Sequence, residues 1–310
     1  MRSPVSSALW VSRMTQSERK HIPVLLNDVI TYLDPKPGAF IVDGTLDGGG
    51  HAEAILERLG PTGKFLGVDL DPEMVERFTE GHGSANVKAV HSNYADLPAV
   101  LEREHLPLAD GLLLDLGFSS EHLEQSGRGF SFLRDEPLRM TYDPQAKSVA
   151  ELLRRIRQDE LARIIREYGG ERWADRVAKA IKIRSQRRPI TTTGDLRDIV
   201  RGALPKYYES GRIDPATRTF QALRIYANDE LGNLEKMLSA LPGLLAPGGR
   251  VVIVSFHSLE DRLVKEAFRT GAQTGWLELL TKKPIEADYG EVRRNPRSRS
   301  AKLRAARKIS

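Results

Sequence analysis

Apolar and polar positions follow two different periods in the first part of the chain. Short apolar runs at residues 39–43, 64–69, 87–91 and 111–115 are each followed by turn residues and then by helical spacing. Strands that alternate with helices in this way are typical of βαβ units. The pattern therefore predicts a parallel sheet covered by helices.

Between about residues 149 and 204 the pattern contains only helices. One amphipathic helix over residues 151–168 is closed by Gly169 and Gly170, and a second begins near Arg172. Thr193 is the predicted N-cap of a third. The preceding stretch, residues 117–144, is rich in turn residues.

The α/β pattern resumes near residue 218. A single amphipathic helix is predicted over residues 218–241, and a turn at 247–249 leads into a strand at 250–256. Ser258 and Asp261 have the spacing of a capping box for the next helix. We predict a doubly wound α/β domain formed by residues 21–123 and 216–310, with an all-helical insertion at 124–215 and a leader at 1–20.

The composition excludes several classes of protein. The chain has no cysteine, which rules out disulfides and thiolate metal sites and is typical of a cytoplasmic protein; no metal site is predicted. No apolar run approaches the roughly 20 residues of a membrane helix. The leader has too short an apolar patch for a secretory signal.

The net charge of +5 is concentrated in two segments. Residues 293–308 hold eight basic residues and no acidic one, and a second basic segment covers residues 154–188. Two such segments favour a polyanionic partner such as nucleic acid. For either segment alone, a solvated surface explains the charge equally well.

The loop after the first predicted strand reads DGTLDGGGH, with glycines at positions 44, 48, 49 and 50. A dinucleotide-binding loop requires G-x-G-x-x-G, and a phosphate-binding P-loop requires Gly-Lys-Ser/Thr. The loop has neither pattern. It therefore favours close approach of the backbone to a ligand without phosphates.

Two carboxylates reduce the range of ligands that this loop could bind. Asp69 ends the second predicted strand, 19 residues after Gly50, where an acidic side chain can accept hydrogen bonds from both ribose hydroxyls. Asp43 could receive an ammonium group. S-adenosylmethionine is a nucleoside with a sulfonium and an amino acid in place of phosphates, and it fits both. Structural roles as loop or helix caps remain open for the same residues.

Several segments resemble the bacterial MraW/RsmH family, from about His21 to the C-terminus. They are HIPVLLNDVI, DGTLDGGGH, DLGFSS, GRGFSF, TFQALRIYANDEL, PGGRVVIVSFHSLEDR and NPRSRSAKLRAA. The resemblance implies a Rossmann-like class I methyltransferase with a seven-stranded, mostly parallel sheet. It also implies transfer of a methyl group from S-adenosylmethionine to the N4 amine of a cytidine in the decoding region of small-subunit ribosomal RNA. The expected partner is this RNA or the 30S subunit, and a homodimer is left open.

The resemblance also assigns residues to the cofactor. They are Gly48, Gly49, Gly50, His51, Asp69, Tyr94, Asp115 and His122. Tyr94 and His122 replace the family's usual phenylalanine and glutamine, and Arg139, Thr141 and Tyr142 depart from its usual PLDMRMD segment.

Methyl transfer to an exocyclic amine depends mainly on positioning. We hypothesise that Asp115 or nearby backbone carbonyls accept a hydrogen bond from the amine, and that Phe118 stacks on the base. His257 could orient the base, contact phosphate or be a buried structural histidine. The turn at residues 128–132 could hold a splayed nucleotide or act as a hinge.

Alternative functions are a methyltransferase for another nucleic acid or a protein, and a nonenzymatic ribosome-assembly factor that binds RNA.

Overall fold

The computed structural model describes residues 23–117, 127–205, 208 and 214–309. The predicted leader lies outside these ranges. The strands are β1 (Phe40–Asp43), β2 (Lys64–Asp69), β3 (Val87–His91), β4 (Ala109–Asp115), β5 (Leu245–Ser255), β6 (Leu277–Leu279) and β7 (Lys302–Lys308). The helices are α1 (Leu26–Leu33), α2 (Gly50–Leu59), α3 (Pro72–Gly81), α4 (Leu97–Arg103), α6 (Val149–Arg155), α7 (Gln158–Gly169), α8 (Ala174–Arg187), α9 (Thr193–Ala203), α10 (Thr217–Ala227), α11 (Glu230–Ala240), α12 (Ser258–Gln273) and α13 (Tyr289–Arg294).

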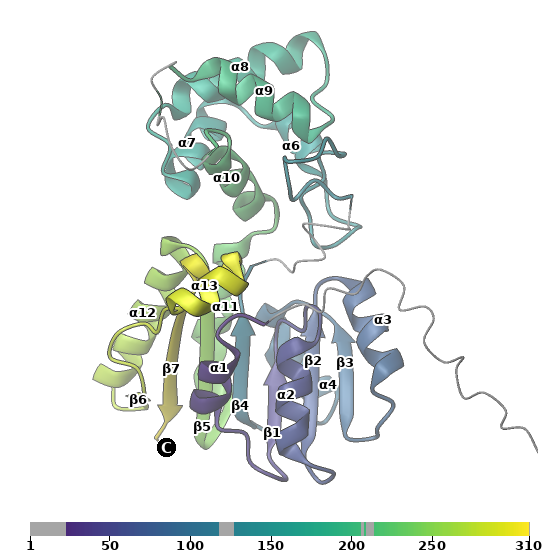
Figure 1. Cartoon of the computed structure of the whole chain (residues 1–310), viewed down its shortest axis with the longest axis vertical. Helices are drawn as coiled ribbons and strands as arrows, with labels where there is room; N and C mark the ends of the chain where they lie inside the picture. Colours follow the sequence, from purple (N-terminus) through teal and green to yellow (C-terminus); the bar gives the residue numbers. More distant parts are fainter. Residues whose placement is uncertain (1–22, 118–126, 206–207, 209–213, 310) are drawn as a thin grey trace, which may run out of the picture.

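The seven strands form one sheet in the order β3-β2-β1-β4-β5-β7-β6 (Figure 1). Strands β1 to β5 are parallel, whereas β7 is antiparallel to both β5 and β6. Val42 of β1 is in register with Leu66 of β2 and Leu112 of β4. The structure thus confirms the predicted Rossmann-like α/β fold with a seven-stranded, mostly parallel sheet.

Successive residues of the central strands enter different cores. Leu112 and Leu114 pack in the cluster covered by α4, α11 and α12, while Leu113 packs in the cluster covered by α1, α2 and α3. Side chains on a strand point alternately to its two faces, so a strand buried on both faces reads as a continuous apolar run. The run GLLLD at residues 111–115 has this origin.

Helices α6 to α10 form a separate lobe above the sheet (Figure 1). Their apolar side chains make one buried cluster, which includes Leu153, Ile165, Ile181 and Phe220. Helix α10, which lies after the predicted end of the insertion at residue 215, contributes Phe220 and Leu223 to this cluster. None of the helices in the described ranges is long and apolar enough to cross a membrane.

The predicted single helix over residues 218–241 was wrong. The chain forms α10 and α11, and between them Asp229 adopts a left-handed conformation with φ of 48°. The Asn228 side chain holds this break, because its amide nitrogen donates to the carbonyls of Met140 and Arg224 and its oxygen accepts from the backbone of Tyr142. The apolar positions keep their helical spacing across the break, so hydrophobic periodicity alone does not reveal it.

The structure also corrects three local predictions, which concern the caps of two helices and the start of a strand. Thr192 rather than Thr193 caps α9, and His257 with Glu260 rather than Ser258 with Asp261 forms the capping box of α12. Residues 247–249 lie within β5 rather than before it. The register against β4 jumps there from Leu245 to Arg250, which makes this segment an irregularity in the strand.

The fold divides the basic C-terminal segment into two parts. In β7, Arg304 donates from Nε to Asp261 at 2.7 Å, Arg307 pairs with Glu278, and Lys308 donates to the backbone carbonyl of Leu245. These cations are tied to the protein itself. The arginines before β7, at positions 293, 294, 297 and 299, lie on α13 and on the 3₁₀ helix η3 (Pro296–Ser300).

Candidate active site

A cavity of about 610 Å³ lies at the carboxyl ends of the parallel strands, the usual ligand position in such sheets. We refer to it as the first cavity. Its lining residues come from the loops after β1, β2, β3 and β4 and from the start of α11 and α12. They are Gly44, Thr45, Asp47, Asp69, Leu70, Asn93, Tyr94, Leu116, Gly117, Tyr142, Asn228, Glu230, Asn233 and Glu260.

Asp69 holds the glycine loop against the end of β2. Its Oδ2 accepts from the backbone N–H of Asp47 at 2.8 Å, and its Oδ1 accepts from the backbone N–H of Asp71 at 2.8 Å. Each carboxylate oxygen has a second acceptor site, so these contacts leave capacity for a ligand. Asp71 caps α3 by accepting from the backbone N–H of Glu73.

Two further carboxylates and a histidine are buried beneath the loop. Asp43 Oδ1 accepts from the Thr45 backbone at 3.1 Å, and His51 Nε2 lies 3.4 Å from Asp115 Oδ2. Among side-chain atoms of the described residues, Asp43 Oδ2, Asp115 Oδ1 and His51 Nδ1 are buried without a hydrogen-bond partner. Buried polar atoms are normally paired, and unpaired ones are characteristic of functional sites.

The carboxylates raise one another's affinity for protons. Burial raises the pKa of Asp43 to about 7, although the nearby His51 opposes the rise. Burial and the charges of Asp69 and Asp115 raise the pKa of Asp47. A cationic ligand would relieve this repulsion.

Two glycines let the loop pass close to its neighbours. A Cβ on Gly44 would lie 2.5 Å from Leu114 Cδ2 and 3.1 Å from Tyr94 Cβ, which is too close for any larger residue without rearrangement. Gly49 caps α2 with φ of 77°, a conformation that residues other than glycine rarely adopt. The loop geometry thus depends on glycine at both positions.

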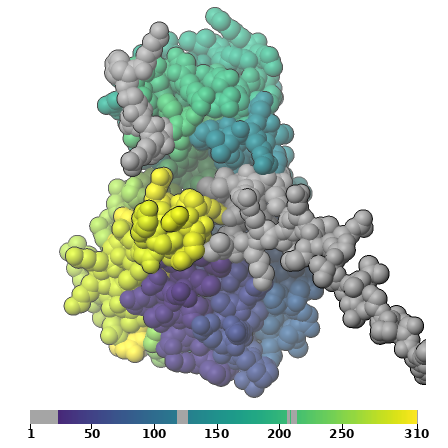
Figure 2. Space-filling view, viewed as in Figure 1, coloured from purple at the N-terminus to yellow at the C-terminus, as the bar shows by residue number. Residues whose placement is uncertain are grey.

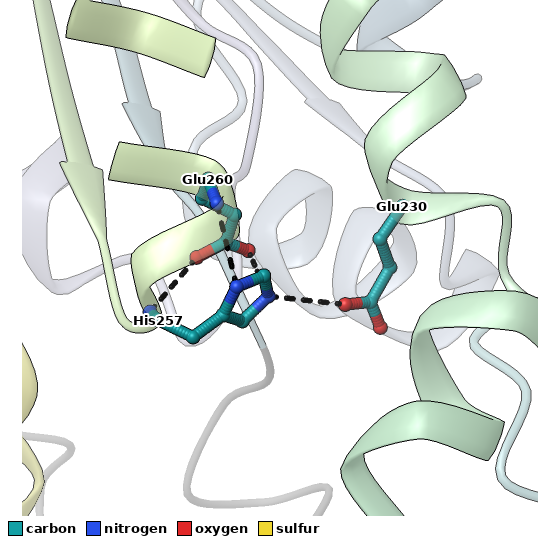
Figure 3. A group of neighbouring side chains, drawn as sticks. All are labelled: Glu230, His257 and Glu260. Carbon is teal, nitrogen blue, oxygen red and sulfur yellow. Dashed lines mark hydrogen bonds and ion pairs between the residues drawn. The ribbon is translucent and has the colours of Figure 1, made fainter. Parts of the chain in front are cut away.

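A second group of charged side chains borders the first cavity at the break between α10 and α11. The Arg224 guanidinium binds both oxygens of Glu230, at 2.8 and 3.0 Å, and the Tyr142 hydroxyl donates to Glu230 Oε1 at 3.2 Å. Figure 3 shows His257 between the carboxylates of Glu230 and Glu260. Its Nε2 lies 3.2 Å from Glu260 Oε1 and 3.9 Å from Glu230 Oε2.

The network favours the charged form of His257. Burial lowers the pKa of His257, but the neighbouring carboxylates of Glu230 and Glu260 outweigh it and raise the pKa to about 9. Glu230, His257 and Glu260 also have side chains of the kind that bind divalent metals, with ligand atoms within 4.8 Å of one another. Arg224 already binds both oxygens of Glu230, so its guanidinium group takes the position beside this carboxylate that a metal ion would need.

A second cavity of about 1600 Å³ opens between the helical lobe and the ends of β4 and β5. It shares Gly117 with the first cavity. Its walls combine aromatic rings with arginines. The lining residues are Gly117, Phe130, Ser131, Phe132, Leu133, Met140, Asp214, Thr217, Phe220, Gln221, Arg224, Phe256, His257, Arg297, Arg299 and Ser300.

One side chain of the turn at residues 128–132 ties the turn to the sheet lobe, and two others line the second cavity. Arg128 is buried and donates from Nη1 to Asp71 at 2.6 Å, which ties the turn to the sheet lobe as a hinge would. Phe130 stacks on Tyr142 with ring centroids 5.2 Å apart, and Phe132 packs on Phe220 at 4.9 Å. Both phenylalanines line the second cavity.

The structure brings most of the predicted site residues together. Asp69 and Tyr94 line the first cavity, and the Tyr94 hydroxyl donates to the backbone carbonyl of Glu230. Asp115 and His51 pack under the loop formed by Gly48, Gly49 and Gly50, and His257 borders the second cavity. Phe118 and His122 lie outside the described residues.

Sequence reasoning missed Glu230 and Glu260. Glu230 stands at the break in a pattern that looked like one helix, and Glu260 looked like an ordinary residue of the first turn of a helix. The usable signal was the spacing of His257 and Glu260, three residues apart, since a capping box places those two side chains together.

Comparison with known proteins identifies the family. A model of the MraW methylase family matches residues 18–309. The chain belongs to this family. It is 46% identical over 311 residues to the ribosomal RNA small subunit methyltransferase H of Geotalea uraniireducens, with 94% of this chain and 100% of that protein covered. It is equally identical over 307 residues to the protein of the same name from Geobacter sulfurreducens, covering 93% and 99%. Among solved structures, a SAM dependent methyltransferase from Aquifex aeolicus aligns with a TM-score of 0.40 and 10% identity over 92% of this chain and 90% of that one.

Membership of the MraW methylase family confirms the predicted cofactor, S-adenosylmethionine. The residues present fit it. The first cavity is lined by carboxylates that suit a cationic ligand, and neither a Walker lysine nor a dinucleotide fingerprint accompanies the glycines of its loop. Asp69 and Tyr94 both line the cavity, and we propose that Asp69 accepts from the ribose hydroxyls and that the ring of Tyr94 covers adenine.

The raised pKa of Asp43 predicts a pH dependence of cofactor binding. Ionised Asp43 costs stability as the pH rises from its ordinary pKa of 3.8 towards 7, and a bound cation offsets that cost. We expect the affinity for S-adenosylmethionine, measured by titration calorimetry, to increase several-fold from pH 6 to pH 8. Asp43→Asn should bind more weakly and lose most of this dependence, while Asp96→Asn on the surface should behave as wild type. An unchanged pH profile in Asp43→Asn contradicts the assignment.

The raised pKa of His257 predicts a loss of stability at alkaline pH. A folded-state pKa of about 9 against an ordinary value of 6.5 means that the stabilisation is fully present below pH 6.5 and is lost as the pH rises through 9. This amounts to at most about 3 kcal/mol. In His257→Asn, which keeps a capping side chain, thermal unfolding should depend less on pH between 7 and 9.5. The exposed His105→Asn serves as control, and equal slopes in the two variants would refute the charged network.

Proposed function

We propose that the chain transfers a methyl group from S-adenosylmethionine to the N4 amine of a specific cytidine in the decoding region of small-subunit ribosomal RNA. The observation that carries the proposal is the pair of cavities that meet at Gly117. One is acidic and suits a cationic cofactor, and the other has aromatic rings and arginines that suit a splayed nucleotide. The names of the relatives, ribosomal RNA small subunit methyltransferase H, support RNA of the small subunit as the substrate.

The domain division is part of the proposal. Residues 21–123 and 216–310 would bind the cofactor, and the inserted residues 124–215 would recognise the substrate. In support, the second cavity takes Phe130, Phe132 and Met140 from the insertion and Phe256 and Arg299 from the sheet lobe. A nucleotide in this cavity would contact both.

Bound S-adenosylmethionine supplies the methyl group on a sulfonium, which is already a good leaving group. The chain's residues must then orient the amine and exclude water. Leu116 and Gly117 line the first cavity directly after β4, so their backbone carbonyls are candidates to accept from the amine. Asp115 lies one residue earlier, with its Oδ2 on His51 and its Oδ1 without a partner. Phe118 follows as the proposed stacking surface, and His257 is proposed to orient the base.

Two alternatives make different predictions. A methyltransferase for DNA or protein would use the same first cavity but would not modify small-subunit RNA. A nonenzymatic assembly factor would bind RNA without turnover. The acidic first cavity, and membership of a methylase family, favour an enzyme.

Small-subunit RNA from a strain that lacks this gene provides the decisive test. We expect mass mapping to show the loss of one N4-methyl group on a decoding-region cytidine. The purified protein should restore it on either the naked RNA or the 30S subunit, which also shows which is the substrate. RNA with unchanged methylation in the deletion strain would refute the proposal, and methylation at a ring carbon or on another base would refute the N4-cytidine assignment.

Replacing Asp115 tests its proposed role in catalysis. We expect Asp115→Asn to lower kcat by about 100-fold, because removal of a preorganised acceptor typically costs this much. The Kd for S-adenosylmethionine should also rise, but by a smaller factor, because Asp115 is among the residues that the family resemblance assigns to the cofactor. His51→Gln is the matched variant. If it loses as much kcat as Asp115→Asn, Asp115 acts by positioning His51 and its loop; full turnover in Asp115→Asn removes it from the mechanism.

A further inference from the structure

The segment before β7 carries a concentration of basic side chains, most of them exposed. Residues 282–300 contain six basic and three acidic side chains. Arg293, Arg294 and Arg299 are exposed, and Arg297 is half-buried. We call these four residues the arginine ledge. Figure 2 shows the C-terminal segment, in yellow, at the level where the two lobes meet.

The acidic residues of this segment do not neutralise the ledge. Asp288 caps α13 by accepting from the Glu291 backbone, and Glu291 Oε1 accepts from the Leu25 backbone at 2.7 Å. Both carboxylates are therefore used at the beginning of α13, whereas Arg293 and Arg294 occupy its last turn. Basic residues in the last turn also complement the helix dipole.

The ledge reaches the mouth of the second cavity. Arg297 and Arg299 line that cavity together with Leu133 from the other lobe. Leu133 is 86% exposed, and Tyr289, at the beginning of α13, is 84% exposed. Large apolar or aromatic side chains that are this exposed beside guanidinium groups are typical of surfaces that bind single-stranded nucleic acid, where bases stack on rings and cations follow the phosphates.

The arginines of β7 differ from those of the arginine ledge. Arg304 and Arg307 in the following strand are paired with Asp261 and Glu278. Before β7, by contrast, Arg293, Arg294 and Arg299 are exposed, and Arg299 lines the second cavity. A polyanion whose base enters that cavity would have its neighbouring phosphates over the ledge.

Accepting the proposed function, we propose that the arginine ledge binds the RNA strand that flanks the target nucleotide. Arg293, Arg294 and Arg299 contact its phosphates, and Tyr289 stacks on a neighbouring base. This assigns to α13 and η3 a substrate-binding role that extends from the second cavity, which Arg299 lines, onto the surface of the protein. The ledge would lower the KM for RNA without taking part in the chemical step.

The test compares the triple variant Arg293→Gln/Arg294→Gln/Arg299→Gln with a matched control. The control, Arg58→Gln/Lys265→Gln/Arg269→Gln, removes the same charge from exposed positions on α2 and α12. The probe is a labelled single-stranded RNA with the decoding-region sequence, and its affinity is measured by fluorescence anisotropy at several salt concentrations. Methylation kinetics on the 30S subunit give KM and kcat separately.

We expect the ledge variant to bind the RNA at least tenfold more weakly and to show a shallower salt dependence, by about two in the log–log slope. Its KM should rise in parallel, with kcat and affinity for S-adenosylmethionine close to wild type. Tyr289→Ala should weaken binding about fivefold, and Tyr289→Phe should restore it, because stacking needs the ring and not the hydroxyl.

Wild-type affinity in the ledge variant, or an equal loss in the control, would overturn the inference. The failure of the proposed function would look different, because wild-type protein would then leave the RNA unmethylated whatever the ledge contributes to binding. The anisotropy measurement does not depend on turnover and so separates the two outcomes.

Discussion

The buried ion pair between Arg224 and Glu230 determines how the two lobes meet. Arg224 lies in the last turn of α10 of the helical lobe, Glu230 begins α11 on the sheet lobe, and the left-handed Asp229 between them turns one side chain towards the other. A buried pair is stable only when its remaining hydrogen-bonding capacity is used. Tyr142 and His257 use it here, so the junction, and both cavities beside it, depends on a few polar contacts with defined geometry.

The first cavity shows the usual conflict between binding and stability. Several carboxylates converge near it, and burial, with a smaller contribution from their mutual repulsion, raises the pKa of Asp43 to about 7. A sequence selected only for folding would have no reason to gather them. Sites of this kind reduce the stability of the free protein and recover it when the cationic ligand binds.

Much of the fold was readable from the sequence, because strands such as GLLLD are buried on both faces and helices such as α7 end at paired glycines. The positions of Asp69 and Asp115 followed from their place at strand ends. The break at Asp229 was not readable, since Asn228 holds it through contacts with Met140 and Tyr142, nearly 90 residues away in the chain. For the same reason Glu230, which the break turns inward, was missed. The charge pattern of the sequence did not distinguish among the C-terminal arginines. Arg304 and Arg307 pair with Asp261 and Glu278, which come near them only in the folded sheet.

The two cavities that share Gly117 have opposite electrical character. Carboxylates surround one, and guanidinium groups stand at the mouth of the other. A phosphate is therefore attracted to the outer end and repelled from the inner one, whereas an uncharged base experiences neither force. For the RNA substrate proposed above, this difference in charge would favour a phosphate beside the arginines over one beside the carboxylates, so the RNA backbone would not compete for the place of a positively charged ligand.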